Sequence, residues 1–123
     1  MAGEGRNPNR RRFRRWSVSI PCTVTWDQQE VITGTISDIS FDGALIRAER
    51  APVEGIAVAV RFAFRDQGVH LQGRVTSEVI HTEEKDQEQI FGVKFETSVE
   101  RFWVQLTPVI QTLLEETSEI EGD

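Results

Sequence analysis

The sequence predicts a mainly β fold, a six-stranded antiparallel β-barrel followed by a C-terminal α-helix. Apolar residues recur at every second position in successive short segments, as they do on half-buried strands. Short segments with turn chemistry link most of these strands, which favours a small barrel over a sandwich. Near the C-terminus the apolar spacing changes to three and four residues, which indicates an amphipathic helix packed on the barrel.

A length of 123 residues indicates one domain with a single modest core. Residues 1–9 are rich in Gly, Asn and Pro, and we expect this tail to be disordered. The domain is expected at 10–116, with a basic arm at 10–15, the barrel at 16–95 and the helix at 98–116; residues 117–123 form an acidic tail.

The first two strands are expected at 16–26 and 30–39, separated by a turn at 27–29. In the first strand Pro21 indicates an unpaired edge or an irregularity, because proline has no N–H to donate to the ladder. Residues 38–43 are expected to form a hairpin corner before a third short strand at 44–46. Gly43 can supply the positive φ that a tight connection demands.

The fourth and fifth strands alternate over 56–64 and 69–79 around a hairpin at Asp66-Gln67-Gly68. Gly73 is expected to mark a bend or bulge. Residues 82–88 form an acidic, solvated loop, and Phe91, Val93 and Phe95 provide the last inward stripe.

The C-terminal helix is expected to begin with Ser98 as its N-cap and to break or restart at Thr107-Pro108. Its apolar stripe is expected to pack on the barrel rather than to hold a cofactor. That stripe comprises Phe102, Trp103, Leu106, Val109, Ile110, Leu113 and Leu114.

Positive charge is concentrated at the N-terminal end of an acidic protein. Residues 1–16 carry six Arg and one Glu, a formal charge of +5, whereas the rest carries 8 basic and 19 acidic residues, a formal charge of -11. Guanidinium groups bind phosphate oxygens and the O6/N7 edge of guanine, and they stack on flat rings. The run Arg-Arg-Arg-Phe-Arg-Arg at 10–15 therefore indicates an anionic, planar ligand, with a solvated tail or a sequence-blind polyanion patch as the alternative.

The sequence contains no pattern typical of an enzyme or of a metal site. His70 and His81 are isolated from other ligating residues, and no phosphate-binding Gly-rich loop or nucleophile elbow is present. Cys22 alternates with apolar residues, so we expect a buried, inert thiol. A lone cysteine and the lack of a signal peptide or a membrane span in the sequence predict a cytoplasmic binding module.

Two motifs together resemble the paired signature of PilZ domains. Arg11-x-x-x-Arg15, preceded by Arg10, is followed after a strand and a turn by Asp38-x-Ser40-x-x-Gly43. Trp16-Ser-Val-Ser-Ile-Pro21 is similar to the first strand of that family and Phe91-Gly-Val-Lys-Phe95 to its last. The resemblance extends over residues 10–114.

The resemblance implies a PilZ-like split barrel that binds the bacterial second messenger cyclic di-GMP, with the arginine arm swinging over one face of the barrel. It assigns Arg11 and Arg15 to guanine edges and phosphates, Asp38 to the guanine N1/N2 donors, Ser40 to guanine or phosphate, and Gly43 to close backbone approach. Arg10 matches a position that goes with a stacked pair of ligand molecules, which favours two per site. Lone domains of this family often act through a protein partner, and the sequence does not identify one.

Two alternatives remain open at this point. Arg10-x-x-x-Arg14 satisfies the same spacing, although the distance to Ile20-Pro21 favours Arg11 and Arg15. The chain could also be a ligand-independent interaction module or a nucleic-acid-binding barrel with a basic arm. The acidic barrel would repel a polyanion beyond the arm, which favours a compact ligand over nucleic acid.

Overall fold

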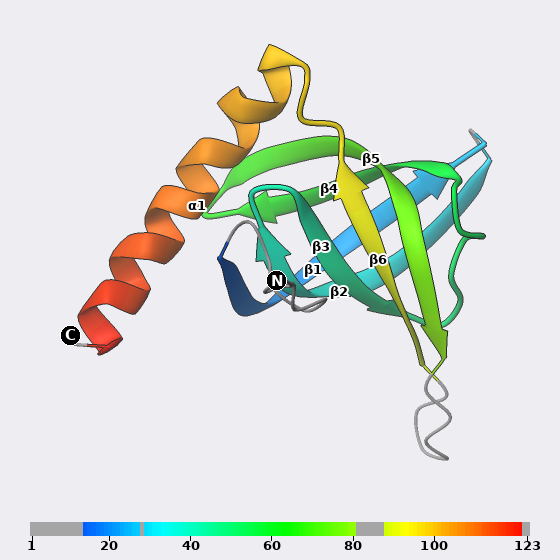
Figure 1. Ribbon diagram of the computed structural model, residues 1–123, viewed down its shortest axis with the longest axis horizontal. Coiled ribbons are helices and arrows are strands. Elements are labelled where there is room, and N and C mark those ends of the chain that lie inside the picture. Colours follow the sequence, from blue (N-terminus) through cyan, green and yellow to red (C-terminus); the bar gives the residue numbers. More distant parts are fainter. Residues whose placement is uncertain (1–13, 28, 81–87, 122–123) are drawn as a thin grey trace, which may run out of the picture.

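The computed structural model describes residues 14–27, 29–80 and 88–121, in which the alternating segments form six strands followed by one helix (Figure 1). Each strand contains β-branched or aromatic residues at its inward positions, and such side chains fit a pleated, half-buried surface. The elements are β1 (Arg15–Trp26), β2 (Glu30–Ser40), β3 (Gly43–Ala48), β4 (Ala57–Phe64), β5 (Gln67–Ile80), β6 (Gln89–Phe95) and α1 (Glu100–Glu121).

The strands close into an antiparallel barrel in the order β1-β2-β3-β6-β5-β4. The closing ladder joins β1 to β4 over a short stretch, Thr23 opposite Arg61 to Thr25 opposite Ala59. Closure pairs strands that would otherwise be left as exposed edges. The six-stranded antiparallel barrel with a C-terminal helix is therefore confirmed.

The inward positions of all six strands and one face of α1 form a single apolar core. Val24, Val60 and Phe91 are completely enclosed. Cys22 lies in the same core, as its alternation with apolar residues predicted.

Three register shifts interrupt the ladders of the described strands, and the one on β2 sets the position of Asp38. Ile36 and Ile39 are three residues apart on β2, yet both are buried. Strict alternation would place them on opposite faces, so the irregularity between Ile36 and Asp38 resets the pattern. Asp38 thereby reaches the outer surface with a side chain that is 22% exposed.

The β2–β3 and β4–β5 hairpin turns are close to their predicted positions. The β2–β3 corner lies at Phe41-Asp42, inside the predicted segment. Gly43 is not among the positive-φ residues of the described chain, so the prediction that it supplies a positive φ is wrong. The β4–β5 turn consists of Arg65 and Asp66, with φ of 51° and 70°, as in a type I′ hairpin, and it begins one residue before the predicted position.

Helix α1 differs from its predicted form at three points. It continues through Pro108 without a break, begins at Glu100 and reaches Glu121, inside the expected acidic tail. Pro108 has no N–H to donate to the Val104 carbonyl one turn earlier. Both residues lie on the exposed side of the helix, so water can donate to this carbonyl instead. Ser98 donates its hydroxyl to the Glu96 carboxylate, so the predicted N-cap bond is replaced.

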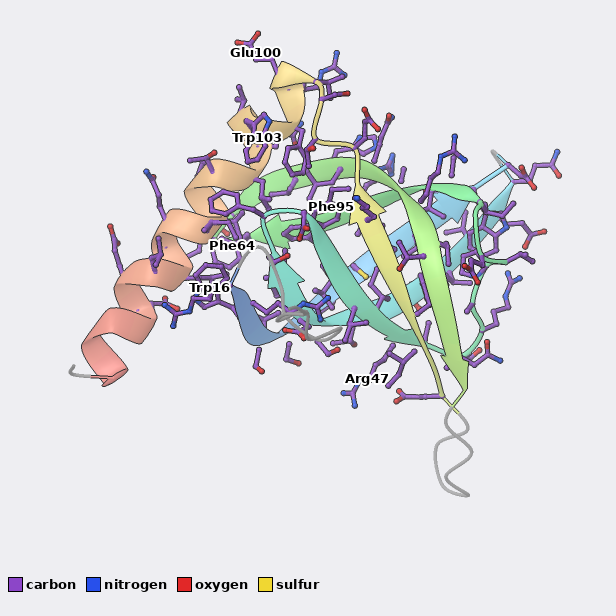
Figure 2. The ribbon with its side chains drawn as sticks, viewed as in Figure 1. Trp16, Arg47, Phe64, Phe95, Glu100 and Trp103 are labelled. Carbon is purple, nitrogen blue, oxygen red and sulfur yellow. The ribbon has the colours of Figure 1, made fainter. Side chains whose placement is uncertain are left out.

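Side chains on one face of α1 fasten it to the barrel. Leu106 and Ile110 are fully buried, whereas Trp103 is 37% exposed and packs on Phe41 at 5.6 Å between ring centroids. Leu114 is 40% exposed, so the predicted stripe is broader than the face that is buried. Figure 2 shows Trp16 and Phe64 at the side of the barrel that faces α1.

Candidate functional site

Arg15 and Asp38 bring the two sequence motifs together on the outer surface of the barrel. Arg15 is the first residue of β1, and its Nη1 donates to Oδ2 of Asp38 on β2 at 3.1 Å. In the ladder Asp38 lies opposite Ser17, so Arg15 reaches it as a diagonal neighbour. The two side chains are 25% and 22% exposed, which leaves both groups accessible to a ligand.

The Ser40 hydroxyl stabilises the β2–β3 turn. It donates to Oδ1 of Asp42 at 2.8 Å and accepts from the Asp42 backbone N–H at 3.3 Å, an arrangement that polar residues commonly make in turns. Ser40 is 1% exposed. Ser40 is therefore buried in this conformation, and it holds the more exposed Asp42 in position. The Asp42 backbone carbonyl also accepts from Phe95 N–H at 2.9 Å.

Gly43 allows two strands to approach closely. A Cβ atom at this position would lie 2.6 Å from the Val93 carbonyl oxygen on β6. No side chain fits there without a shift of the backbone, so glycine is required by close approach. The close approach that the resemblance implied is thus made to the neighbouring strand.

A cavity of about 240 Å³, here called the Arg15 cavity, opens beside these groups. It lies over β3, β5 and β6 next to the start of β1. Arg15, Asp42 and Gly43 line it, together with two outward residues that neither motif contains, Thr76 and Lys94. The cavity is thus lined by two cations, Arg15 and Lys94, by the Asp42 carboxylate and by the Thr76 hydroxyl.

The position of Arg14 bears on the choice between the two arginine registers. The Arg14 guanidinium lies over the Trp16 ring, 5.1 Å from its centroid, whereas Arg15 contacts Asp38. This geometry favours the register that ends at Arg15. Arg10 and Arg11 lie outside the described residues.

Thr76 and Lys94 are the lining residues that sequence reasoning missed. Lys94 is the outward residue between Val93 and Phe95, and it pairs with Gly43 across the β3–β6 ladder. Thr76 lies at the register shift between Val75 and Ser77 and is exposed. The alternation of β6 marks Lys94 as outward, but only the strand order shows that it adjoins Gly43.

A larger cavity, of about 650 Å³, lies over β1, β4, β5 and β6 and is here called the Arg74 cavity. It shares Lys94 with the Arg15 cavity, and it is also lined by Arg74 and Glu96. None of Arg15, Asp38, Ser40 and Gly43 lines it. We therefore assign the candidate site to the smaller Arg15 cavity, which Arg15 and Gly43 line directly. Asp38 and Ser40 do not line this cavity, but each is hydrogen-bonded to a residue that does, Asp38 to Arg15 and Ser40 to Asp42.

Cys22 and the histidines are the candidates for catalysis or metal binding in the sequence, and the structure places Cys22 in the core. Burial raises the pKa of the Cys22 thiol to about 11, so the reactive thiolate is disfavoured. His70 is exposed and His81 lies outside the described residues. Within 14–27, 29–80 and 88–121 no group of three or more His, Cys, Asp or Glu side chains is placed to hold a metal ion.

No helix in the described part of the chain is long and apolar enough to cross a membrane.

Comparison with known proteins gives one family. The model of the PilZ domain matches residues 9–105, which includes both motifs and all six strands. No curated protein matches the chain.

Several solved structures share the fold. The PilZ domain with c-di-GMP of YcgR from Escherichia coli superposes with a TM-score of 0.70 at 19% identity and covers 94% of this chain and 99% of that one. The K. pneumonia MrkH–c-di-GMP complex gives a TM-score of 0.73 at 14% identity, covering 90% of this chain and 55% of MrkH. The Bacillus subtilis inhibitor of motility MotI/DgrA gives 0.61 at 12% identity, covering 87% and 53%. At these identities the likeness establishes the fold alone.

Proposed function

Because the chain belongs to the PilZ domain family, we propose that it is a receptor for cyclic di-GMP, with Arg10, Arg11, Arg15, Asp38, Ser40 and Gly43 as its binding residues. The observation that carries this proposal is the Arg15–Asp38 pair beside the Arg15 cavity. Its role is binding rather than catalysis. The c-di-GMP complexes of YcgR and MrkH, which share the fold, support the choice of ligand.

The chemistry of the pair suits guanine. A guanidinium group donates to the O6/N7 edge of guanine or to phosphate, and a carboxylate accepts from the N1 and N2 donors. The bond from Arg15 uses Oδ2 of Asp38. No hydrogen bond from another described residue engages Oδ1 of Asp38, so one carboxylate can orient the arginine and accept from guanine.

The size of the Arg15 cavity supports a role for the arm. Pockets that enclose a small molecule usually measure about 300–1,000 Å³, and the Arg15 cavity measures about 240 Å³. A cyclic dinucleotide would therefore lie partly outside it. We propose that the arm at 10–15 covers the exposed part, with its clustered guanidinium groups neutralised by the ligand phosphates.

Ordering of the arm would convert binding into a signal. The arm carries five Arg and the remainder of the protein is acidic, so closure changes both the shape and the charge of one face. We propose that a protein partner recognises this face. Arg10 is assigned to a second, stacked ligand molecule, so the stoichiometry is proposed to be two per site.

Titration calorimetry with the full chain tests the proposal. We expect binding of cyclic di-GMP and much weaker binding of cyclic di-AMP, because adenine lacks the N1 and N2 donors that Asp38 would accept from. Arg15→Gln should weaken binding by about ten- to hundredfold, the range for a lost charge-assisted hydrogen bond. Arg61→Gln is the matched control, since Arg61 is exposed on β4 and lines neither cavity. Equal binding of both dinucleotides would refute the guanine assignment.

Limited trypsin digestion tests the arm separately. Cleavage at 10–15 should slow markedly with saturating cyclic di-GMP, while the barrel stays intact in both conditions. Equal cleavage rates with and without bound ligand would show that the arm plays no part in the response.

A further inference from the structure

We propose that Lys94, with Thr76 beside it, forms a second wall of the Arg15 cavity and binds a phosphate of the ligand. This inference rests on the proposed function and extends it to residues outside both sequence motifs. The two strands that supply this wall, β5 and β6, are adjacent in the barrel, whereas the motif residues that the structure describes belong to β1, β2 and β3.

The position of Lys94 follows from the strand order. Lys94 lies opposite Gly43 in the β3–β6 ladder and opposite Arg74 in the β5–β6 ladder. It is exposed, whereas its neighbours Val93 and Phe95 are buried. Lys94 therefore borders from β6 the hollow that Arg15 borders from β1 and Gly43 from β3.

The charges of the cavity single out Lys94. The Arg15 guanidinium is already paired with Asp38, and Asp42 accepts from Ser40. Within the described part of the chain no carboxylate lies within ion-pair distance of Lys94, and Glu96, two residues further along β6, accepts from Ser98. Lys94 therefore contributes to the cavity a positive charge that no described carboxylate pairs with, and an ammonium group of this kind binds phosphate as a point charge.

Thr76 adds a neutral group to the same wall. The register shift between Val75 and Ser77 coincides with its exposed position at the cavity. A hydroxyl can donate to a phosphate oxygen or accept from a ribose hydroxyl, so it suits the sugar-phosphate ring of a cyclic dinucleotide. A cation and a hydroxyl on one side then complement the arginine and carboxylate on the other.

Lys94 also borders the Arg74 cavity, where Arg74 adds a second cation and Glu96 a carboxylate. A phosphate held there instead would depend on Arg74 rather than on Arg15. The comparison of Lys94 and Arg74 variants therefore distinguishes the two placements.

The experiment is a titration of cyclic di-GMP into the full chain and four variants, at low and high salt. We expect Lys94→Gln to weaken binding about five- to tenfold, which is less than the loss of a buried charge contact because Lys94 is exposed. The affinity of this variant should also depend less steeply on salt concentration than that of the wild type. Lys94→Arg should keep most of the affinity. Arg61→Gln and Arg74→Gln should bind like the wild type.

Each outcome has a defined meaning. If wild type binds and Lys94→Gln binds equally well with the same dependence on salt, the Lys94 wall is refuted and the proposed function stands. If Arg74→Gln loses as much affinity as Lys94→Gln, the phosphate lies in the Arg74 cavity and the proposal is likewise overturned. If the wild type itself does not bind, the proposed function fails and this inference fails with it. A far-ultraviolet circular dichroism spectrum and a melt of each variant separate lost binding from lost folding.

Discussion

Replacement of Gly43 by alanine tests how closely the walls of the site are held together. The added Cβ would lie 2.6 Å from the Val93 carbonyl oxygen, 3.6 Å from the Val93 carbonyl carbon and 3.7 Å from Lys94 Cα. The first distance is far below van der Waals contact and involves backbone, which cannot rotate away as a side chain can. Strands β3 and β6 would have to separate at the Gly43–Lys94 pair.

Overpacking that displaces backbone costs about 1–3 kcal/mol of unfolding free energy. With a urea dependence of about 1.5 kcal/mol per molar, a loss of about 2 kcal/mol lowers the unfolding midpoint by about 1.3 M. Binding of cyclic di-GMP should weaken as well, because the same pair borders the Arg15 cavity.

Urea unfolding followed by circular dichroism measures this effect, and Gly68→Ala is the matched control. No atom lies within 4 Å of a Cβ at Gly68, and its φ is not in the left-handed region. The control should change the unfolding free energy by no more than about 0.5 kcal/mol. An unchanged midpoint for Gly43→Ala would refute the argument from close approach.

Three further predictions concern other parts of the molecule. A double-mutant cycle with Arg15→Gln and Asp38→Asn should give non-additive losses of cyclic di-GMP affinity, whereas additive losses would show that the two groups act independently. The pKa of Cys22 is raised from 9.0 to about 11 in the folded protein, so the free energy of unfolding should fall as pH rises from about 9 to about 11. The fall should be less steep in Cys22→Ala, and an equal fall in both proteins, measured by urea unfolding, would contradict this. Pro108→Ala should raise the melting temperature, because it restores a helical N–H at an exposed position, and an unchanged or lower value would contradict the cost assigned to this proline.

The order and type of the elements could be predicted because period-two alternation and the later change to helical spacing both follow from one-sided burial. The three-residue spacing of the buried Ile36 and Ile39 reflects the register shift on β2. A shift of one residue can be recognised only once the partner strands are known. Pro108 misled the prediction, since the cost of an interior proline is local and the packing of Leu106 and Ile110 outweighs it.

The site was predictable only in part. Arg15 and Asp38 follow from motif spacing, and the structure brings them into contact. Gly43 was expected for its backbone freedom, whereas it is required by the Val93 carbonyl on a strand that lies about 50 residues later in the chain. Lys94 is absent from both motifs because its place in the site depends on β6 lying between β3 and β5.

The most direct measurement of the central claim is a map of backbone amide shifts during titration of the isotope-labelled full chain with cyclic di-GMP. We predict saturable shifts at Arg15, at 38–43 and at Thr76 and Lys94, with little change at Ala57 and Ala59 in the Arg74 cavity. Shifts confined to the Arg74 cavity would place the ligand elsewhere on the barrel. A spectrum unchanged at saturating ligand would show that this chain keeps the PilZ fold without binding cyclic di-GMP.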